Sequence, residues 1–286
     1  HIQFHSYGGG EGDENTFNSK VTELVDYVNA HPNLTVDVGQ VLFGETTSMT
    51  ADGPLGYYLS NAFKSKWFSS DTEMESGCGI APIEYKNTSL VHSLQWAIGL
   101  EWYLLAKDPW RVVMSTDHPN GGSFLAYPQI IQLLMDRTYR QDMLKSVHPA
   151  VLERSTLADL TREYSLYEIC IITRSGPAKI LGLANKGHLG PGADADITIY
   201  TPSDDKTKMF ELPRLVIKSG RIIVEQGEIR GPLAGKLLYV SPEYDSGIET
   251  ATADWYEKYY SIRFRNYRVP LDYLHHPEEV ALTGGL

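Results

Sequence analysis

The feature that most constrains this chain is an alternation of strand-like and helix-like patterns. Short β-branched runs lie at His1–His5, Leu34–Phe43 and Trp110–Ser115, and helical patterns at Asn18–Asn29 and Leu90–Ala106 separate them. Strands that alternate with helices at this spacing pair in parallel, because each crossover returns the chain to the same edge of the sheet. The alternation therefore predicts a parallel sheet covered by helices.

The character of the chain changes near residue 185, where short alternating strands replace the α/β pattern. Gly44–Gly56 is predicted to be a long loop, and Ser165 with Glu168 has the spacing of a capping box at a helix start. Gly220 predicts a hairpin turn between two strands. The elements expected after residue 120 are helices at Gln129–Leu144, Leu166–Thr173 and Ala178–Leu183, and strands at Ile197–Tyr200, Arg214–Ser219 and Arg221–Gln226.

Charge and cysteine content exclude several classes of function. The chain has 25 basic and 36 acidic residues, a net charge of −11, so it lacks the basic surface that nucleic acids or anionic membranes attract. Its two cysteines, Cys78 and Cys170, form no CxxC pair and no disulfide framework, which favours a reducing compartment. Since the sequence has neither an apolar run of membrane-spanning length nor a signal peptide, we expect a cytoplasmic protein without a membrane span.

The beginning of the chain is unusual, because it has no initiator Met and opens inside an apparent strand. About three strands are expected before residue 120, whereas a closed (β/α)₈ barrel takes about 250 residues. We therefore expect a fragment of a longer protein, with less than half of such a barrel before residue 120.

Asp117 is the strongest candidate for chemistry, because it follows a buried strand in a polar turn. The carboxyl ends of barrel strands build the active site, and a carboxylate there can bind a metal and accept a proton from water. His118 follows directly and can face a substrate carbonyl or carboxylate. The alternative roles are a turn or N-cap aspartate and a histidine that caps a loop.

His1 and His5 lie on one face of the opening strand, because alternate residues of a strand share a face. Imidazoles placed there can serve as zinc ligands, although a strand histidine is more often an ordinary polar group. Asn120, Gly121 and Gly122 allow the backbone to approach a substrate closely. No GxGxxG follows a strand, and neither a P-loop nor a GxSxG elbow occurs, so nucleotide-binding and serine-hydrolase sites have no support.

Three segments together resemble the cyclic-amide amidohydrolases, the group that includes dihydroorotases and hydantoinases. Ser115–Pro119 resembles the strand-8 motif of that group, Pro177–Ile197 its junction between barrel and β-sandwich, and Val216–Val224 its final hairpin. Further segments resemble one branch, the A subunits of formylmethanofuran dehydrogenases and of formyltransferase/hydrolase complexes. These segments are His1–Gly8, Val36–Gln40, Thr50–Pro54, Gln95–Glu101 and Thr116–Gly122.

The resemblance implies a fold and a set of roles. The fold is α/β, the C-terminal half of a metal-dependent (β/α)₈ amidohydrolase barrel over residues 1–185. A small β-sandwich over 186–240 and a C-terminal extension over 241–286 with subunit contacts follow. Asp117 matches the metal-bound aspartate that acts as the base, and His1 matches the strand-6 metal histidine, with His5 as the alternative. The other ligands of a binuclear zinc site, a His-x-His pair, a carboxylated lysine and another histidine, would precede residue 1.

The implied activity is the reversible hydrolysis of N-formylmethanofuran to formate and methanofuran. Its setting would be a formylmethanofuran dehydrogenase complex with B, C, D and iron–sulfur subunits, in methanogenesis-type one-carbon metabolism. Molybdopterin or tungstopterin and iron–sulfur clusters are expected only in those partner subunits. The alternatives are a formyltransferase/hydrolase complex that performs hydrolysis alone, a hydantoinase-like hydrolase, and a non-catalytic assembly scaffold.

Overall fold

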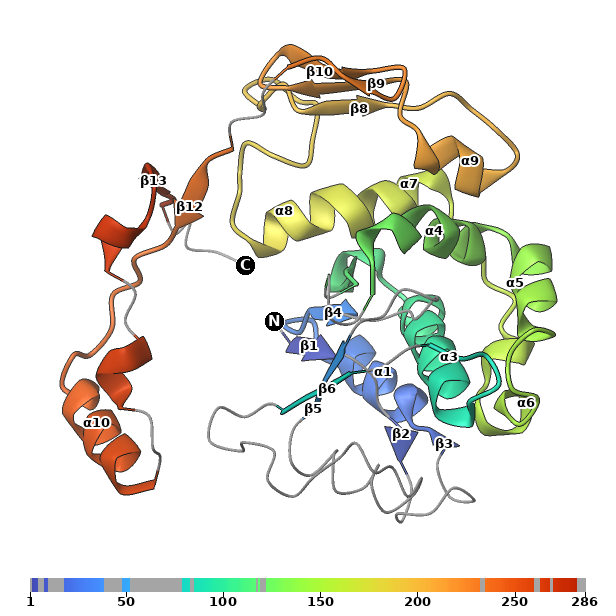
Figure 1. The fold of residues 1–286 in the computed structure, drawn as a ribbon, viewed down its shortest axis with the longest axis horizontal. Coiled ribbons are helices and arrows are strands. Elements are labelled where there is room, and N and C mark those ends of the chain that lie inside the picture. Colours follow the sequence, from blue (N-terminus) through green and yellow to red (C-terminus); the bar gives the residue numbers. More distant parts are fainter. Residues whose placement is uncertain are drawn as a thin grey trace.

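A three-stranded parallel sheet forms the centre of the fold (Figure 1). The computed structural model describes residues 2–4, 8–9, 18–38, 48–51, 79–82, 85–116, 118, 122–231, 235–259, 263–267 and 270–281. The sheet consists of β1 (Ile2–Phe4), β4 (Val36–Val38) and β7 (Val112–Met114), in the order β1-β4-β7. Both pairings are parallel, so the prediction from the strand–helix alternation is confirmed for these strands.

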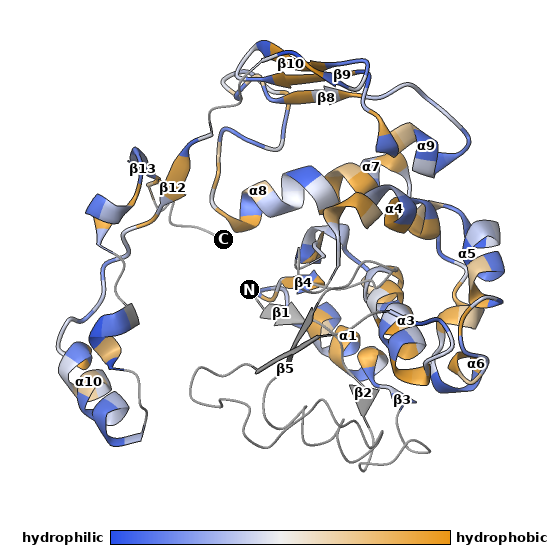
Figure 2. Ribbon diagram, in the orientation of Figure 1, coloured by the Kyte–Doolittle hydropathy of each residue, from blue (hydrophilic) through white to orange (hydrophobic). Residues whose placement is uncertain are grey.

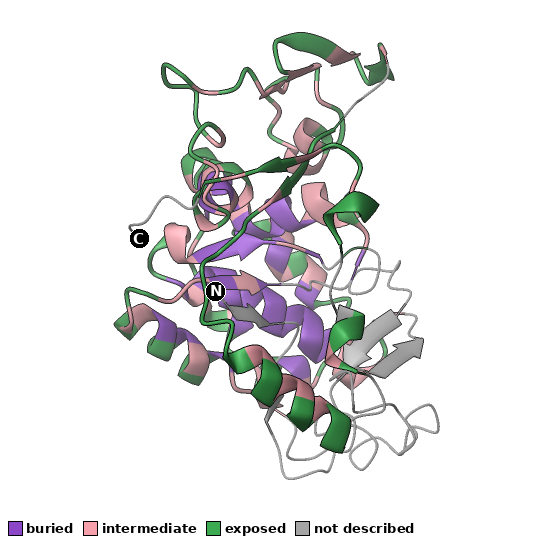
Figure 3. Cartoon of the chain, turned by 90° about the vertical axis from the view of Figure 1, so that its left-hand side faces the viewer, coloured by how far each residue is buried: buried purple, intermediate pink, exposed green. Residues whose placement is uncertain are grey.

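Two helices bury their apolar residues next to this sheet. In α1 (Val21–Ala30), Val21, Val25 and Val28 are buried at a spacing that puts them on one helix face. The longer α3 (Leu90–Leu105) is buried at every position from Ser93 to Leu104, because other elements cover it on all sides. Figure 2 shows hydrophobic stretches along α1, α3 and α4, and Figure 3 shows the buried residues gathered around the central strands.

The segment after β7 differs from the single helix predicted at 129–144. It contains α4 (Tyr127–Met135) and α5 (Arg137–Leu144), which are separated at Asp136. Asp136 has extended backbone angles, and its side chain accepts a hydrogen bond from the backbone N–H of Tyr139 at 2.9 Å. Because an aspartate in this position caps the first turn of a new helix, the apolar periodicity alone did not reveal the break.

A continuous helical run follows α6 (Val151–Arg154). It consists of α7 (Leu166–Cys170), the π-helical segment η4 (Ile171–Ser175) and α8 (Gly176–Ile180). The predicted capping box is confirmed, because Ser165 and Glu168 each bond the other's backbone N–H. The two helices predicted at 166–173 and 178–183 are therefore one run, which ends before Gly182 with a φ of +69°.

The prediction of a loop over Gly44–Gly56 is wrong in its centre. Residues Ser48–Ala51 form β5, which pairs antiparallel with β6 (Gly79–Pro82). This pairing joins segments far apart in the sequence, and a run of Ser, Met, Thr and Ala gives little local indication of a strand.

A second sheet of four antiparallel strands lies beyond residue 196 and has the order β11-β10-β9-β8. Its turn at Ser219 and Gly220 has φ values of +49° and +78°, as a two-residue hairpin turn requires, which confirms the predicted turn. The helix α9 (Lys206–Glu211) packs on α4, and the Thr207 N–H bonds Gln132 Oε1 at 3.0 Å. The strands are β8 (Ile197–Ile199), β9 (Leu215–Lys218), β10 (Arg221–Glu225) and β11 (Glu228–Ile229).

The C-terminal extension beyond residue 236 extends away from the rest of the chain on one side (Figure 1). Its strands β12 (Leu237–Tyr239) and β13 (Pro277–Glu279) pair in parallel, and α10 (Ile248–Tyr259) lies between them in sequence. Within the described ranges, no helix has the length and apolar character needed to cross a bilayer. Shorter elements are β2 (Gly8–Gly9), β3 (Asn18–Ser19), η1 (Pro109–Arg111), η2 (Phe124–Ala126), η3 (Leu157–Asp159), η5 (Phe264–Tyr267) and η6 (Leu271–Tyr273).

Candidate functional site

The carboxyl ends of the three parallel strands define the candidate site. The register aligns Phe4 with Val38 and Val38 with Met114, so the strands end at one edge. After β7 the chain continues through Ser115 and Thr116, and Thr116 is 1% exposed. The predicted base, Asp117, is the next residue in the sequence, and it lies outside the described residues.

Most of the predicted site residues lie outside the described ranges: His1, His5, Asp117, Asn120 and Gly121. Two others are described. Gly122 is buried, as expected for a glycine in a close-packed loop. Within the described residues, no group of three or more His, Cys, Asp or Glu side chains is arranged to hold a metal ion.

His118 is exposed and has a defined local environment. Its Nδ1 accepts a hydrogen bond from the backbone N–H of Phe124 at 3.4 Å, and its ring meets the Phe124 ring edge-on with centroids 4.5 Å apart. These contacts fix the imidazole against the 3₁₀ turn η2. The loop-capping role weighed for this histidine therefore has a structural basis, and a role toward substrate stays a prediction.

Asp37 is a polar residue near the site that the sequence analysis did not single out. It lies in the middle of β4 between the fully buried Val36 and Val38, and its register partner on β7 is Val113. Alternation places its side chain on the face opposite those valines. The signal in the sequence was a carboxylate inside a β-branched strand, a position where charged residues are rare.

Two tyrosines lie close to Asp37 and to the end of β7. Burial, with the added charge of Asp37, raises the pKa of the Tyr103 hydroxyl well above its usual value, and a backbone hydrogen bond with Ser115 partly offsets this. Burial also raises the pKa of Tyr127, hydrogen bonding to Thr116 lowers it in part, and Asp37 raises it further. Both phenols are therefore neutral at physiological pH and available as hydrogen-bond donors.

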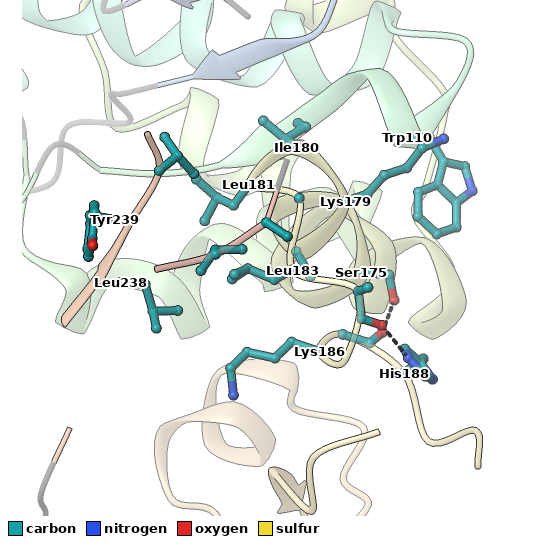
Figure 4. Close-up of a pocket in the computed structure, with 17 residues that line it drawn as sticks. Trp110, Ser175, Lys179, Ile180, Leu181, Leu183, Lys186, His188, Leu238 and Tyr239 are labelled. Atoms are coloured by element: carbon teal, nitrogen blue, oxygen red, sulfur yellow. Dashed lines mark hydrogen bonds between the residues drawn. The ribbon is translucent and has the colours of Figure 1, made fainter. Parts of the chain in front are cut away.

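The largest groove lies away from these residues (Figure 4). Its volume is about 930 Å³, and its walls come from the end of α8, the segment after it, and β12 with β13. Trp110, in η1 directly before β7, lines one side, and Lys179 Nζ lies 5.5 Å from its ring centroid. Because Trp110 adjoins the amino end of β7, this groove is distinct from the candidate site at the carboxyl edge.

Comparisons with known proteins identify the family of the chain. The model of the amidohydrolase family matches residues 6–224. Protein FwdA of Methanocaldococcus jannaschii is 40% identical over 285 residues, which are 96% of this chain and 50% of that protein. The A subunit of the formyltransferase/hydrolase complex Fhc of Methylorubrum extorquens is 41% identical over 274 residues, 94% of this chain and 50% of that protein.

A solved structure supports the same relationship. The crystal structure of the formyltransferase/hydrolase complex FhcABCD from Methylorubrum extorquens with methylofuran matches with a TM-score of 0.73 and 39% identity. The match covers 92% of this chain and 49% of the matched chain. The chain thus spans about half the length of the relatives it matches. These relatives confirm the resemblance stated from the motifs, and the family match over residues 6–224 shows that the chain belongs to the amidohydrolase family.

Proposed function

We propose that this chain is part of a larger hydrolase polypeptide that cleaves the formyl amide of a furan-amine one-carbon carrier, N-formylmethanofuran or its methylofuran counterpart. The main support is the match, at 39% identity and a TM-score of 0.73, to a chain of a complex solved with methylofuran. The relatives at 40% and 41% identity over nearly the whole chain agree with this proposal. A hydantoinase-like activity has no such support.

The reaction replaces one bond to the formyl carbon. Water adds to the carbonyl carbon and forms a C–O bond, the C–N bond then breaks, and formate and the free amine leave. One proton moves from the attacking water to the amine nitrogen. Asp117 is the proposed carrier of this proton, because a carboxylate next to the reacting atoms can accept it and return it as the acid. His118, Asn120, Gly121 and Gly122 would line the substrate.

The family implies a divalent metal, and we propose zinc. When bound, zinc is a Lewis acid that lowers the pKa of water to about 7. Imidazole and carboxylate are ligands that zinc accepts, so His1 or His5 together with Asp117 fit such a site chemically. These residues would hold only part of a binuclear centre, with the remaining ligands in the segment of the full-length protein that precedes this chain.

The proposed domain organisation follows the same family. Residues 1–185 would form the second part of the barrel, 186–240 strands of a small β-sandwich, and 241–286 an extension for subunit contacts. Three features support this division: the parallel sheet β1-β4-β7, the antiparallel sheet that begins at β8, and the C-terminal extension that stands apart in Figure 1.

The complex to which the protein belongs is proposed on its relatives. The dehydrogenase setting would include B, C, D and iron–sulfur subunits with molybdopterin or tungstopterin, and the alternative is a hydrolysis-only complex with a formyltransferase. Identities of 40% to FwdA and 41% to its Fhc counterpart favour neither. Copurification decides between them, because a pterin-binding molybdenum or tungsten subunit would appear only in the first.

Replacement of Asp117 tests the catalytic proposal against a non-catalytic scaffold. In the full-length protein with its partners, Asp117→Asn keeps the size of the side chain and removes the base. We expect formate release to fall by a factor of about 10² or more, with assembly unchanged on size-exclusion chromatography. Formate release at the wild-type rate by the assembled variant would refute the role of Asp117, and absence of release by the wild type would favour the scaffold.

A further inference from the structure

Tyr103 connects the ends of two neighbouring strands. Its side chain comes from α3 and is fully buried, and its hydroxyl donates a hydrogen bond to the backbone oxygen of Val38 at 3.3 Å. Val38 is the last residue of β4. The same hydroxyl has a backbone hydrogen bond with Ser115, the first residue after β7. One phenol therefore bridges the carboxyl ends of β4 and β7.

A second tyrosine approaches the same segment from the other side. Tyr127 begins α4, and hydrogen bonding to Thr116 affects its hydroxyl. Thr116 itself is 1% exposed. The dipeptide Ser115–Thr116 is thus held between Tyr103, from the helix before β7, and Tyr127, from the helix after it, and it leads directly into Asp117.

We propose that Tyr103 is a positioning residue, whose hydroxyl fixes the carboxyl end of β7 relative to β4 and so sets where Asp117 is presented. This inference rests on the proposed function only for the role of Asp117. The physical reason is that the central strands are three residues long, so few ladder hydrogen bonds restrain their ends. A buried hydrogen bond at the strand end reduces local opening of a segment that must hold a reacting group in place.

The alternative is that the Tyr103 hydroxyl only satisfies a buried carbonyl group. A matched control exists in Tyr164, which is 2% exposed and donates its hydroxyl to the backbone oxygen of Tyr103 at 2.6 Å. Tyr164→Phe removes a buried phenolic hydrogen bond to the same helix but does not affect the ends of β4 and β7. The two variants therefore separate a general loss of stability from a local loss of positioning.

The test compares Tyr103→Phe and Tyr164→Phe in the full-length protein with its partners. Amide hydrogen exchange is followed in the peptide that covers residues 112–118, with correction for global stability. For Tyr103→Phe we expect exchange there to be roughly five-fold faster, the factor that corresponds to one lost hydrogen bond. For Tyr164→Phe we expect no local change. Formate release should show kcat lowered roughly ten-fold in Tyr103→Phe with KM within two-fold, because orientation rather than binding is lost.

Equal exchange of residues 112–118 in both variants would overturn the inference, as would an unchanged kcat in Tyr103→Phe. A failure of the proposed function has a different signature. If the wild type releases no formate from either formylated furan amine, the assigned reaction is wrong, whereas the exchange measurement still decides whether Tyr103 fixes the end of β7.

Discussion

At the scale of single residues, Asp196 has the densest set of charged partners among the described residues. Its Oδ2 accepts hydrogen bonds from Lys186 Nζ at 2.7 Å and Lys218 Nζ at 2.5 Å, and its Oδ1 accepts one from the Ser219 N–H at 2.9 Å. Burial alone would raise its pKa, but these hydrogen bonds hold the pKa of Asp196 well below its usual value. The carboxylate thus joins the segment after α8 to the β9–β10 turn.

A depressed pKa makes the stability of the folded state depend on pH. Asp196 contributes stability that is present above the unfolded-state pKa of about 3.9 and lost as pH falls toward the lower folded-state pKa. Asp196→Asn should therefore lower the free energy of unfolding at pH 7 by about 1–2 kcal/mol. The difference from wild type should shrink below about pH 4. Thermal unfolding between about pH 7 and about pH 3 measures both quantities.

Asp194→Asn is the matched control, because Asp194 has one ion pair, with Lys186, and its side chain is 43% exposed. Exposed pairs contribute about 0–1 kcal/mol. If Asp196→Asn and Asp194→Asn cost the same stability at neutral pH, the hydrogen-bond network around Asp196 is not the source of the effect.

The candidate site was predictable where residues form a motif and hidden where packing creates the contact. Asp117 follows a buried strand in a polar turn, and that local pattern predicts a functional group. Tyr103 lies in a helix of mostly apolar residues, where a tyrosine is expected to belong to the core. Only the fold reveals that its hydroxyl reaches Val38, which is 65 residues away in sequence.

At the scale of secondary structure elements, the break between α4 and α5 depends on Asp136. Asp136→Ala removes the acceptor for the Tyr139 N–H and should destabilise the protein by about 1 kcal/mol. Chemical denaturation with linear extrapolation measures the change. Asp142→Ala on the same helix is the control, because Asp142 forms only an exposed ion pair with Lys145, worth about 0–1 kcal/mol. A larger effect of Asp142→Ala would contradict this account.

The elements themselves were largely predictable from periodicity and turn chemistry. The spacing of Val21, Val25 and Val28 indicated α1, and the Ser165–Glu168 pattern indicated the start of α7. The errors arose where tertiary contacts decide. The strand at Ser48–Ala51 depends on a partner about 30 residues later in the chain, and such a partner leaves no trace in the local pattern.

At the scale of the whole molecule, metal content is the decisive property. We expect the full-length protein to contain about two zinc ions per polypeptide. Chelation should abolish formate release and added zinc should restore it, since the metal supplies the Lewis acid. Elemental analysis with activity before and after chelation measures this. A content below about one zinc per polypeptide in the intact complex would contradict the catalytic proposal.

The π-helical segment η4 has a consequence for how this family can change in length. The Gly176 N–H reaches back five residues to the carbonyl of Ile171, so η4 holds one residue more than an α-helix needs. One residue corresponds to about 100° of rotation, so α7 and α8 are out of phase with each other. Deleting a residue of η4 would turn Ala178 away from Gly187, where a Cβ atom would come within 2.7 Å of Ala178 Cβ. Single insertions and deletions should therefore be purged from η4 during evolution unless the segment around Gly187 shifts with them.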